Sequence, residues 1–258
     1  MSESRADPGL RPVLAVEEVS VRFGGLQALD AVDLRVDEGT VTGLIGPNGA
    51  GKTTLFNVIT GLEKPSRGRV SIGGTEVGRM APYHRARLGL ARTFQRLEIF
   101  GSLSARDNVL AAAEFRRGWA RDKSDPPAVT DEILDRVGLT AVADSRVDAL
   151  PTGLARLVEL GRALAVRPRI LLLDEPGSGL DSRESRVLGE LLTSLAGEGM
   201  AVLVVEHDMD LVMRICDPVY VLDFGRIIAS GSPKAVQSDP AVQAAYLGAD
   251  AEMIERVG

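Results

Sequence analysis

The sequence lacks several features, and each absence excludes a class of protein. Cys216 is the only cysteine, so no disulfide can form within the chain. The longest purely apolar runs, such as AVLVV at 201–205, are the size of a strand and far shorter than the ~20 residues of a membrane-spanning helix. The opening residues MSESRADPGLRP are polar and do not resemble a secretory signal. Together these features predict a protein of a reducing cytosol.

A basic surface stripe is also missing. The net charge is −6, and acidic and basic residues are interspersed, which argues against a protein that binds nucleic acid irrespective of its sequence. The chain does have 258 residues of which 45% are apolar, enough to bury a sizeable core. Its length fits one large domain or a domain with an inserted subdomain.

Short β-branched runs alternate with helical patterns over much of the chain. The runs include VLAVEEVSVRF, VTGLI, ILLLD and AVLVVE, and helices are expected from Lys52, near 184–196 and from Asp208. Such alternation favours an α/β fold in which crossover helices join parallel strands. After the last strands, GSPKAVQ predicts a helix with Ser232 as its cap and Pro233 at its first position.

The pattern changes in the middle of the chain. Residues 92–165 carry few strand signals and several helical ones, including RDNVLAAAEFRR and TDEILDRVG. We therefore expect a helical subdomain at 92–165, inserted between two parts of one core at 1–91 and 166–258. Within it, the polar, proline-bearing stretch RDKSDPPAVT at 121–130 predicts an exposed loop. Later in the chain, DFG at 223–225 predicts a hairpin turn.

A phosphate-binding loop is the strongest local signal. GPNGAGKTT at 46–54 follows the apolar run VTGLI and precedes the helical run LFNVIT, which Gly61 closes. Glycines let the backbone wrap closely around a phosphate with its N–H groups pointing inward, and the helix start adds partial positive charge. In this pattern Lys52 pairs with the β- and γ-phosphates, and the Thr53 hydroxyl binds Mg²⁺. Five further positions contribute to the predicted site: Asn48, Gly49, Ala50, Gly51 and Thr54. The alternative is a plain glycine-rich turn between a strand and a helix.

Two carboxylates end a second apolar strand. In ILLLDEP at 170–176, Asp174 and Glu175 follow a buried run and lie at the edge of the sheet where open α/β folds bind ligands. Asp174 is suited to hold the Mg²⁺ hydration shell, and Glu175 to polarise an attacking water. A solvated strand end is the alternative interpretation. The chain has three asparagines, and none lies in the Asn-Lys-x-Asp pattern that reads guanine, so the expected nucleotide is ATP.

Taken together, these residues resemble the ATPases of ABC transporters, and the resemblance covers nearly the whole chain. Besides GPNGAGKT and LLLDEP it rests on Phe23, Gln95 in ARTFQ, SGLD at 178–181 and His207 in VVEHDM, which occur in the family's order. Finer features resemble the importers of branched-chain amino acids: GLARTFQRLEIFGSLSARDNV, VEHDMDLVM and DPAVQAAYLG at 239–248. The resemblance implies an α/β fold with a RecA-like P-loop core, a mixed parallel sheet, an N-terminal antiparallel β element and an inserted α-helical subdomain.

The same resemblance implies roles for three further residues. Phe23 would stack on adenine, although Val19, Val21 and Phe23 also alternate like one core-facing side of a strand. Gln95 would contact Mg²⁺ or the attacking water and sense the membrane partner, whereas a lone glutamine is usually a surface residue. His207 would bind the γ-phosphate and orient Glu175, whereas a histidine after a buried strand is often structural.

One motif departs from the family. Its members present Leu-Ser-x-Gly-Gln at a helix start to the nucleotide of a facing subunit, and here LPTGL stands at 150–154. Gly153 remains for that nucleotide, but Pro151 replaces the serine and lacks an N–H, and Leu154 replaces the glutamine. The resemblance therefore favours a heterodimer with unequal ATP sites, with a homodimer also possible. The alternative is that this helix start only packs.

The function that the resemblance implies is that of an ATP-hydrolysing, energy-coupling subunit of an importer, bound peripherally at the cytoplasmic face of the membrane. Its expected partners are integral permease subunits, a second ATPase subunit and, indirectly, an extracytoplasmic solute-binding protein; nucleic acid is not one. Residues 95–103 would contact a short helix of the permease. Export of lipid or lipopolysaccharide, and soluble ABC ATPases of DNA repair or translation, are the alternatives.

Overall fold

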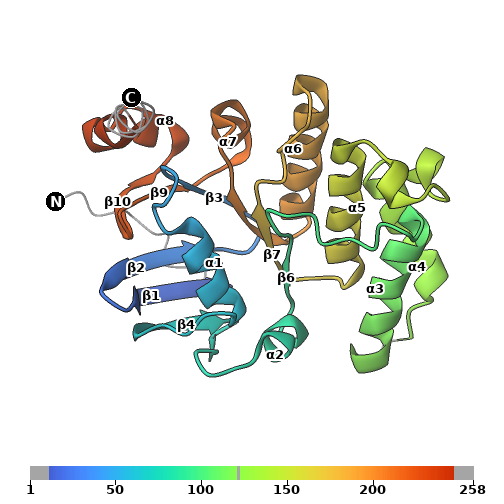
Figure 1. Ribbon diagram of the computed structural model, residues 1–258, viewed down its shortest axis with the longest axis horizontal. Helices are drawn as coiled ribbons and strands as arrows, with labels where there is room; N and C mark the ends of the chain where they lie inside the picture. The colour runs from blue at the N-terminus through green and yellow to red at the C-terminus, as the bar shows by residue number, and fades with distance from the viewer. Residues whose placement is uncertain (1–11, 121–122, 247–258) are drawn as a thin grey trace.

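The computed structural model describes residues 12–120 and 123–246. Two β-sheets lie side by side, some helices lie beside them, and a separate group of helices forms one end of the molecule (Figure 1). The N-terminal stretch in which no signal was expected lies mostly outside the described residues, as do the last two residues of the DPAVQAAYLG motif.

The first sheet is antiparallel throughout. Its strand order is β2-β1-β4-β5, and each neighbouring pair is antiparallel. The strands are β1 Leu14–Phe23, β2 Leu26–Val36, β4 Arg67–Ile72 and β5 Thr75–Glu76. This sheet is the expected N-terminal antiparallel element.

The second sheet is mixed, with the order β10-β9-β3-β8-β7-β6. Every pair from β9 to β6 is parallel, and only β10 runs antiparallel to its neighbour. The strands are β3 Val41–Ile45, β6 Leu90–Arg92, β7 Ile170–Asp174, β8 Ala201–Val205, β9 Val219–Asp223 and β10 Arg226–Gly231. The three central strands β3, β7 and β8 are buried at every position, which is why they appear in the sequence as continuous apolar runs.

Successive side chains of these strands enter two separate cores. Leu171 and Leu173 join a cluster formed with the longer helices, whereas Ile170 and Leu172 join one shared with the antiparallel sheet. The division follows from the two-residue repeat of a strand. The helices that pack on or beside the sheets are α1 Lys52–Thr60, α2 Pro82–Arg87, α6 Ser182–Gly197, α7 Met209–Ile215 and α8 Pro233–Gln237.

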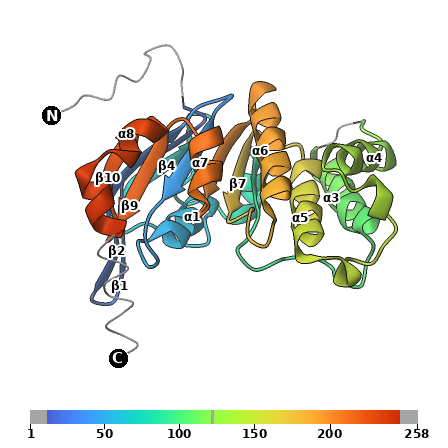
Figure 2. The ribbon, with the colours of Figure 1, turned by 90° about the horizontal axis from the view of Figure 1, so that it is seen from above.

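Between β6 and β7 the described chain contains no strand. It forms α3 Ala105–Ala120, α4 Pro126–Arg136 and α5 Thr152–Ala165, with 3-10 turns at Thr140–Val142 and Val147–Ala149. These helices lie together at the end of the molecule far from β1 and β2 in both ribbon views (Figures 1 and 2).

One local prediction is wrong. Residues 121–130 were expected to form a loop, but α4 begins at Pro126, and Val129 and Thr130 are buried. Proline is compatible with the first turn of a helix because the N–H it lacks has no intrahelical partner there. The polar, proline-bearing composition therefore marks a helix start.

Other local predictions are confirmed. Gly61 ends α1 in the left-handed conformation, and the Ser232 hydroxyl accepts a hydrogen bond from the Ala235 N–H at the start of α8. Phe224 and Gly225 form the turn between β9 and β10, both with positive φ.

In the described ranges, no helix is both long and apolar enough to cross a bilayer.

Candidate nucleotide-binding site

The loop between β3 and α1 needs glycine at two positions for steric reasons. A Cβ on Gly46, whose φ is 152°, would lie 1.9 Å from the carbonyl oxygen of Leu222. At Gly51, φ is 111° and a Cβ would lie 2.8 Å from the oxygen of Ala28. Both positions therefore exclude a side chain. Gly49 also has positive φ but faces open space, so its requirement is conformational.

Lys52 turns its ammonium group back into this loop. Its Nζ donates to the carbonyl oxygens of Gly46, at 2.5 Å, and Pro47, at 2.9 Å. Lys52 is only 7% exposed, and this burial lowers the pKa of its ammonium, an effect that Glu175 and Asp174 oppose. The loop thus holds a buried cation close to two carboxylates.

The remaining predicted residues of the loop differ in exposure. Asn48, Gly49 and Thr53 are exposed, Gly51 and Thr54 are half-buried, and Ala50 is buried. Because α1 begins at Lys52 without a side-chain cap, its first N–H groups remain open to an anion.

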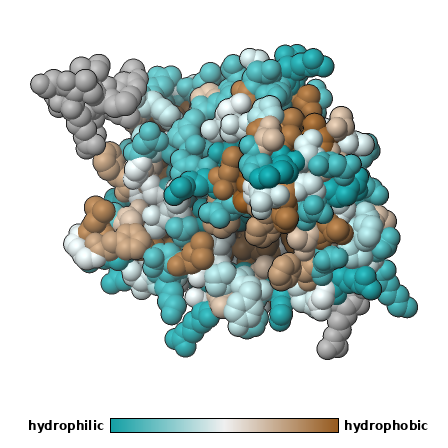
Figure 3. All heavy atoms as spheres, turned by 45° about the vertical axis from the view of Figure 1, so that its right-hand side comes forward, coloured by the Kyte–Doolittle hydropathy of each residue, from teal (hydrophilic) through white to brown (hydrophobic). Residues whose placement is uncertain are grey.

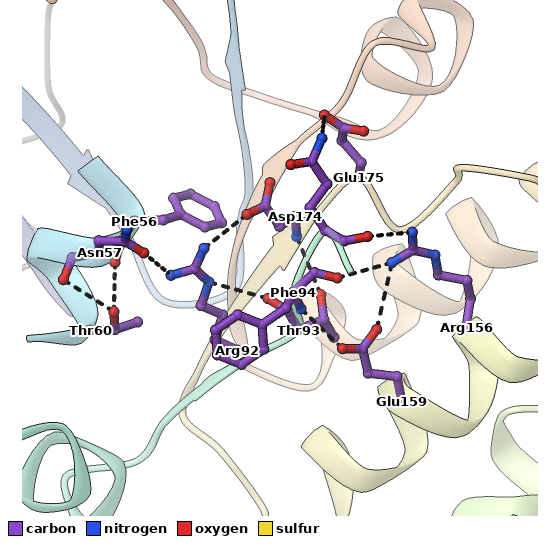
Figure 4. A network of polar contacts seen from close by, with 11 residues as sticks. Phe56, Asn57, Thr60, Arg92, Thr93, Phe94, Arg156, Glu159, Asp174 and Glu175 are labelled. Carbon is purple, nitrogen blue, oxygen red and sulfur yellow. Dashed lines mark hydrogen bonds and ion pairs between the residues drawn. The ribbon is translucent and has the colours of Figure 1, made fainter. Parts of the chain in front are cut away.

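Asp174 ends β7 and pairs with an arginine that the motif analysis did not select. Arg92, at the end of β6, donates from Nη2 to Asp174 Oδ2 at 2.9 Å, and from Nη1 to Asn57 Oδ1 at 2.7 Å. Both side chains of the pair are at most 5% exposed. The Asp174 N–H also donates to the Thr93 hydroxyl at 3.3 Å (Figure 4). The carboxylate is therefore fixed before any ligand binds.

Glu175 lies at the centre of a set of polar contacts. It adopts a positive φ of 52°, and its N–H donates to Val205 O at 2.9 Å. Its Oε1 accepts from Gln95 Nε2 at 3.2 Å and lies 3.0 Å from His207 Nε2. A non-glycine residue in this conformation is uncommon and is held only where its surroundings impose it. Residues predicted from three separate motifs thus meet at one carboxylate.

Glu206 stabilises the backbone on which Glu175 and His207 are placed. It is buried, and its carboxylate accepts from the N–H of Gly177 at 2.5 Å and from that of His207 at 3.1 Å. Burial raises the pKa of Glu206, and the backbone N–H groups oppose that shift. It joins the segment after Glu175 to the segment that carries His207.

Phe23 does not belong to the core. Val19 and Val21 are buried, whereas Phe23 at the end of β1 is 47% exposed. The core-packing interpretation of Phe23 is therefore wrong, and stacking on a base stays a prediction.

The start of α5 carries the departing motif. Pro151 and Thr152 are exposed, and Gly153 is buried. A Cβ on Gly153 would lie 2.8 Å from Leu180 Cδ2, so the glycine has a packing reason within the chain. The packing interpretation is thereby supported, and a contact between Gly153 and a partner's nucleotide stays a prediction.

Comparison with known proteins identifies the family. The family model described as ABC transporter matches residues 29–178, more than half of the chain. The chain belongs to the ABC transporter family. The model described as Branched-chain amino acid ATP-binding cassette transporter matches residues 226–252 of this ABC protein.

Individual relatives agree with this assignment. The ABC chain is 38% identical over 251 residues to the high-affinity branched-chain amino acid transport ATP-binding protein BraF of Pseudomonas aeruginosa, with 92% of this chain and 98% of BraF covered. It is 32% identical over 236 residues to the lipopolysaccharide export system ATP-binding protein LptB of Haemophilus influenzae, with 92% and 97% covered. A crystal structure of an ATP-binding cassette in its ADP conformation superposes with a TM-score of 0.81 at 32% identity, covering 92% and 99%.

The residues present in the ABC site fit magnesium and a nucleotide. No group of three or more His, Cys, Asp or Glu in the described ranges could hold a metal ion alone. Mg²⁺ typically binds through one or two carboxylates together with phosphate oxygens of the substrate, and keeps several waters. The Thr53 hydroxyl, the Asp174 carboxylate and the Gln95 amide are hard oxygen ligands of this kind.

Motif reading did not select Arg92, Glu206 or Glu159. Glu159, on α5, accepts from the N–H of Phe94 at 3.1 Å. The side chains of Arg92 and Glu159 are 5% and 6% exposed and Glu206 is buried, and a charged residue within an apolar pattern was the available signal. Their partners could not be identified from local spacing, because Arg92 and Asp174 are 82 residues apart in the chain.

Proposed function

We propose that this ABC protein is the ATP-hydrolysing, energy-coupling subunit of an importer for branched-chain amino acids or related small polar solutes. The observation that carries the proposal is the convergence of Gln95 and His207 on Glu175, next to a phosphate-binding loop with its lysine. The match of residues 226–252 to the branched-chain amino acid family and the likeness to BraF support the solute class.

The roles proposed for the residues follow from their positions. Lys52 and the N–H groups of 48–54 bind the triphosphate, and Phe23 stacks on adenine. Thr53, Asp174 and Gln95 hold Mg²⁺, which neutralises phosphate charge when bound. Glu175 accepts a proton from the attacking water.

His207 keeps that glutamate in place. Its ring Nε2 faces Glu175 Oε1, and its backbone N–H donates to the Glu206 carboxylate. An oriented carboxylate acts on a water at one fixed position. His207 and Glu175 therefore promote hydrolysis by placing the carboxylate correctly. The division into parts at 1–91, 92–165 and 166–258 belongs to this proposal, with the helical part moving relative to the rest.

A first experiment tests hydrolysis. The purified chain, alone and with its partner subunits, is expected to release phosphate from Mg·ATP, and Lys52→Ala to abolish both release and nucleotide binding. Lys64→Ala, at an exposed lysine just after α1, is the matched control and should behave like the wild type. Hydrolysis by Lys52→Ala at the wild-type rate would contradict the proposed site.

The surface formed by residues 94–103 supports a membrane partner. Phe94, Phe100 and Leu103 are exposed in this segment. Apolar residues also gather around a hollow on the face turned forward in Figure 3, within a largely hydrophilic surface. Exposed apolar groups of this kind suit a protein interface. We infer that this segment contacts a short helix of an integral permease. The subunit then lies at the cytoplasmic face of the membrane.

The proposed assembly contains a second ATPase subunit. A heterodimer is favoured because LPTGL lacks two side chains of the signature motif, so the two ATP sites would differ; a homodimer is the alternative. A solute-binding protein would act through the permease. Copurification of the chain with its permease, followed by identification of the second ATPase subunit, decides between the two.

Export of lipid or lipopolysaccharide is the second candidate, and the likeness to LptB favours it. Uptake of labelled leucine into membrane vesicles that contain the purified complex distinguishes the two. Uptake that depends on ATP and fails with Lys52→Ala supports import. Copurification with an exporter permease and no leucine uptake would support the second candidate.

A further inference from the structure

Residues 93–100, which include Gln95, form neither helix nor strand. Their backbone N–H and C=O groups therefore need partners outside a regular ladder, because unpaired buried groups are costly. Several of these partners are charged side chains of a single helix, α5.

Arg156 and Glu159 hold the beginning of the segment. Arg156 donates from Nη1 to Phe94 O at 3.0 Å and from Nη2 to Gln95 O at 2.7 Å. Glu159 Oε1 accepts from the N–H of Phe94 at 3.1 Å and from that of Glu98 at 3.4 Å. Figure 4 shows both side chains pointing from α5 to this backbone. The positively charged Arg156 thus binds carbonyl groups of the segment, and the negatively charged Glu159 binds its N–H groups.

Arg162 extends the row along α5. It donates to Glu98 O, and its guanidinium lies 4.6 Å from the ring centre of Phe100. Positions 156, 159 and 162 are spaced by three residues, so their side chains lie along one side of the helix.

Little of the first two side chains of the row is exposed to solvent. The side chains of Arg156 and Glu159 are 10% and 6% exposed, and Arg156 Nη1 lies 3.7 Å from Glu159 Oε2. Burial raises the pKa of Glu159, while the N–H groups of Phe94 and Glu98 and the charge of Arg156 oppose that shift. Charge-assisted hydrogen bonds in such surroundings are stronger than neutral ones and restrict the backbone they hold.

The backbone held in this way carries the side chain that reaches Glu175. The residues that Glu159 holds flank Gln95 on both sides, and Arg156 binds the carbonyl of Gln95 itself. The amide of Gln95 then donates to Glu175 Oε1. A shift of α5 along its axis would therefore move Gln95 and change its contact with Glu175.

We propose that Arg156 and Glu159 are positioning residues that set Gln95 against Glu175, so that α5 and the segment 94–98 move as one unit. This inference rests on the proposed ATPase function. It also connects the LPTGL end of α5, which begins at Thr152, to the catalytic carboxylate of the same chain.

The kinetic test uses Glu159→Ala in the assembled complex. Loss of the one carboxylate oxygen that accepts from two N–H groups frees the backbone around Gln95, so kcat is expected to fall about tenfold while the KM for ATP changes less than about twofold. Glu159→Gln keeps an acceptor oxygen and should retain most of the rate. Glu132→Ala, at an exposed glutamate of α4, is the matched control and should be unchanged. A wild-type kcat in Glu159→Ala would overturn the proposal.

A double-mutant cycle separates positioning from general structural support. If Glu159 acts through Gln95, the pair Gln95→Ala with Glu159→Ala should be no slower than Gln95→Ala alone. Multiplied losses, or a normal rate in Gln95→Ala, would overturn the inference. A wild-type complex without ATPase activity would instead contradict the proposed function.

Hydrogen exchange gives a readout independent of hydrolysis. The amides of Phe94 and Glu98 should exchange about tenfold faster in Glu159→Ala than in the wild type, and at the wild-type rate in Glu132→Ala. Glu159→Gln preserves the acceptor oxygen and the fold, so it is the variant to measure if Glu159→Ala fails to fold. In Glu159→Gln both amides should stay protected and the rate of hydrolysis should be kept. Unchanged exchange in Glu159→Ala, or loss of protection in Glu159→Gln, would contradict the assignment.

Discussion

The two surfaces assigned to nucleotide differ in how completely their polar groups are arranged. At the loop 46–54 and the strand ends, the chain alone fixes the lysine, both carboxylates and the histidine. At the start of α5, no side chain caps the helix and its first turn has no acidic residue, so its first backbone N–H groups lie without a side-chain acceptor beside the exposed Thr152. In the proposed dimer, this chain thus contributes a complete half to its own ATP site and, to the partner's site, a half that depends on helix polarity.

The largest expected effect tests the complete half. Glu175→Gln removes the carboxylate that accepts the proton of the attacking water, so kcat should fall by about 10² to 10⁴ while Mg·ATP still binds. Phosphate release and equilibrium binding measure the two quantities. Glu190→Gln, at an exposed position of α6, serves as control. Hydrolysis at the normal rate would show that the base lies elsewhere.

The effect of Asp174 on the free energy of unfolding tests the same half. Asp174→Ala leaves the buried Arg92 without its carboxylate, which should reduce the free energy of unfolding by about 3 kcal/mol in the absence of nucleotide. Denaturant unfolding measures the change, and Asp135→Ala at an exposed position of α4 should stay within about 0.5 kcal/mol of the wild type. A loss for Asp174→Ala no larger than that of the control would contradict a structural role of the ion pair.

The two halves also differ in how far the sequence predicts them. The glycine loop and the apolar strands with their terminal carboxylates are contiguous motifs whose local geometry follows from residue type. The partners of Arg92 and Glu159 come from segments 82 and 65 residues away, and no local pattern contains that pairing. The helix start at Pro126 was misread because proline favours loops and first helical turns alike.

Phe23 offers a smaller effect at the edge of the complete half. Its exposed ring is available to a base, so Phe23→Ala should weaken ATP binding by about 1 to 3 kcal/mol. Calorimetry of the isolated chain measures this loss. The control is Phe224→Ala, at an equally apolar and more exposed ring on the β9–β10 turn. Equal affinities for both variants would remove Phe23 from the site.

The smallest effect concerns the other half. Replacing Pro151 by Ser and Leu154 by Gln restores two polar side chains, each worth about 0.5 to 1.5 kcal/mol where it reaches the partner's nucleotide. The ATPase rate of the assembled complex should then rise a few fold, and that of the isolated chain should not. An unchanged complex would show that Gly153 and helix polarity suffice.

A crystal structure of Glu175→Gln with Mg·ATP tests the central claim most directly. The account predicts the triphosphate within the N–H groups of 48–54, with its terminal phosphates on Lys52 Nζ and the amide of residue 175 facing the γ-phosphate. A nucleotide bound away from Lys52, or an empty loop at saturating Mg·ATP, would contradict it.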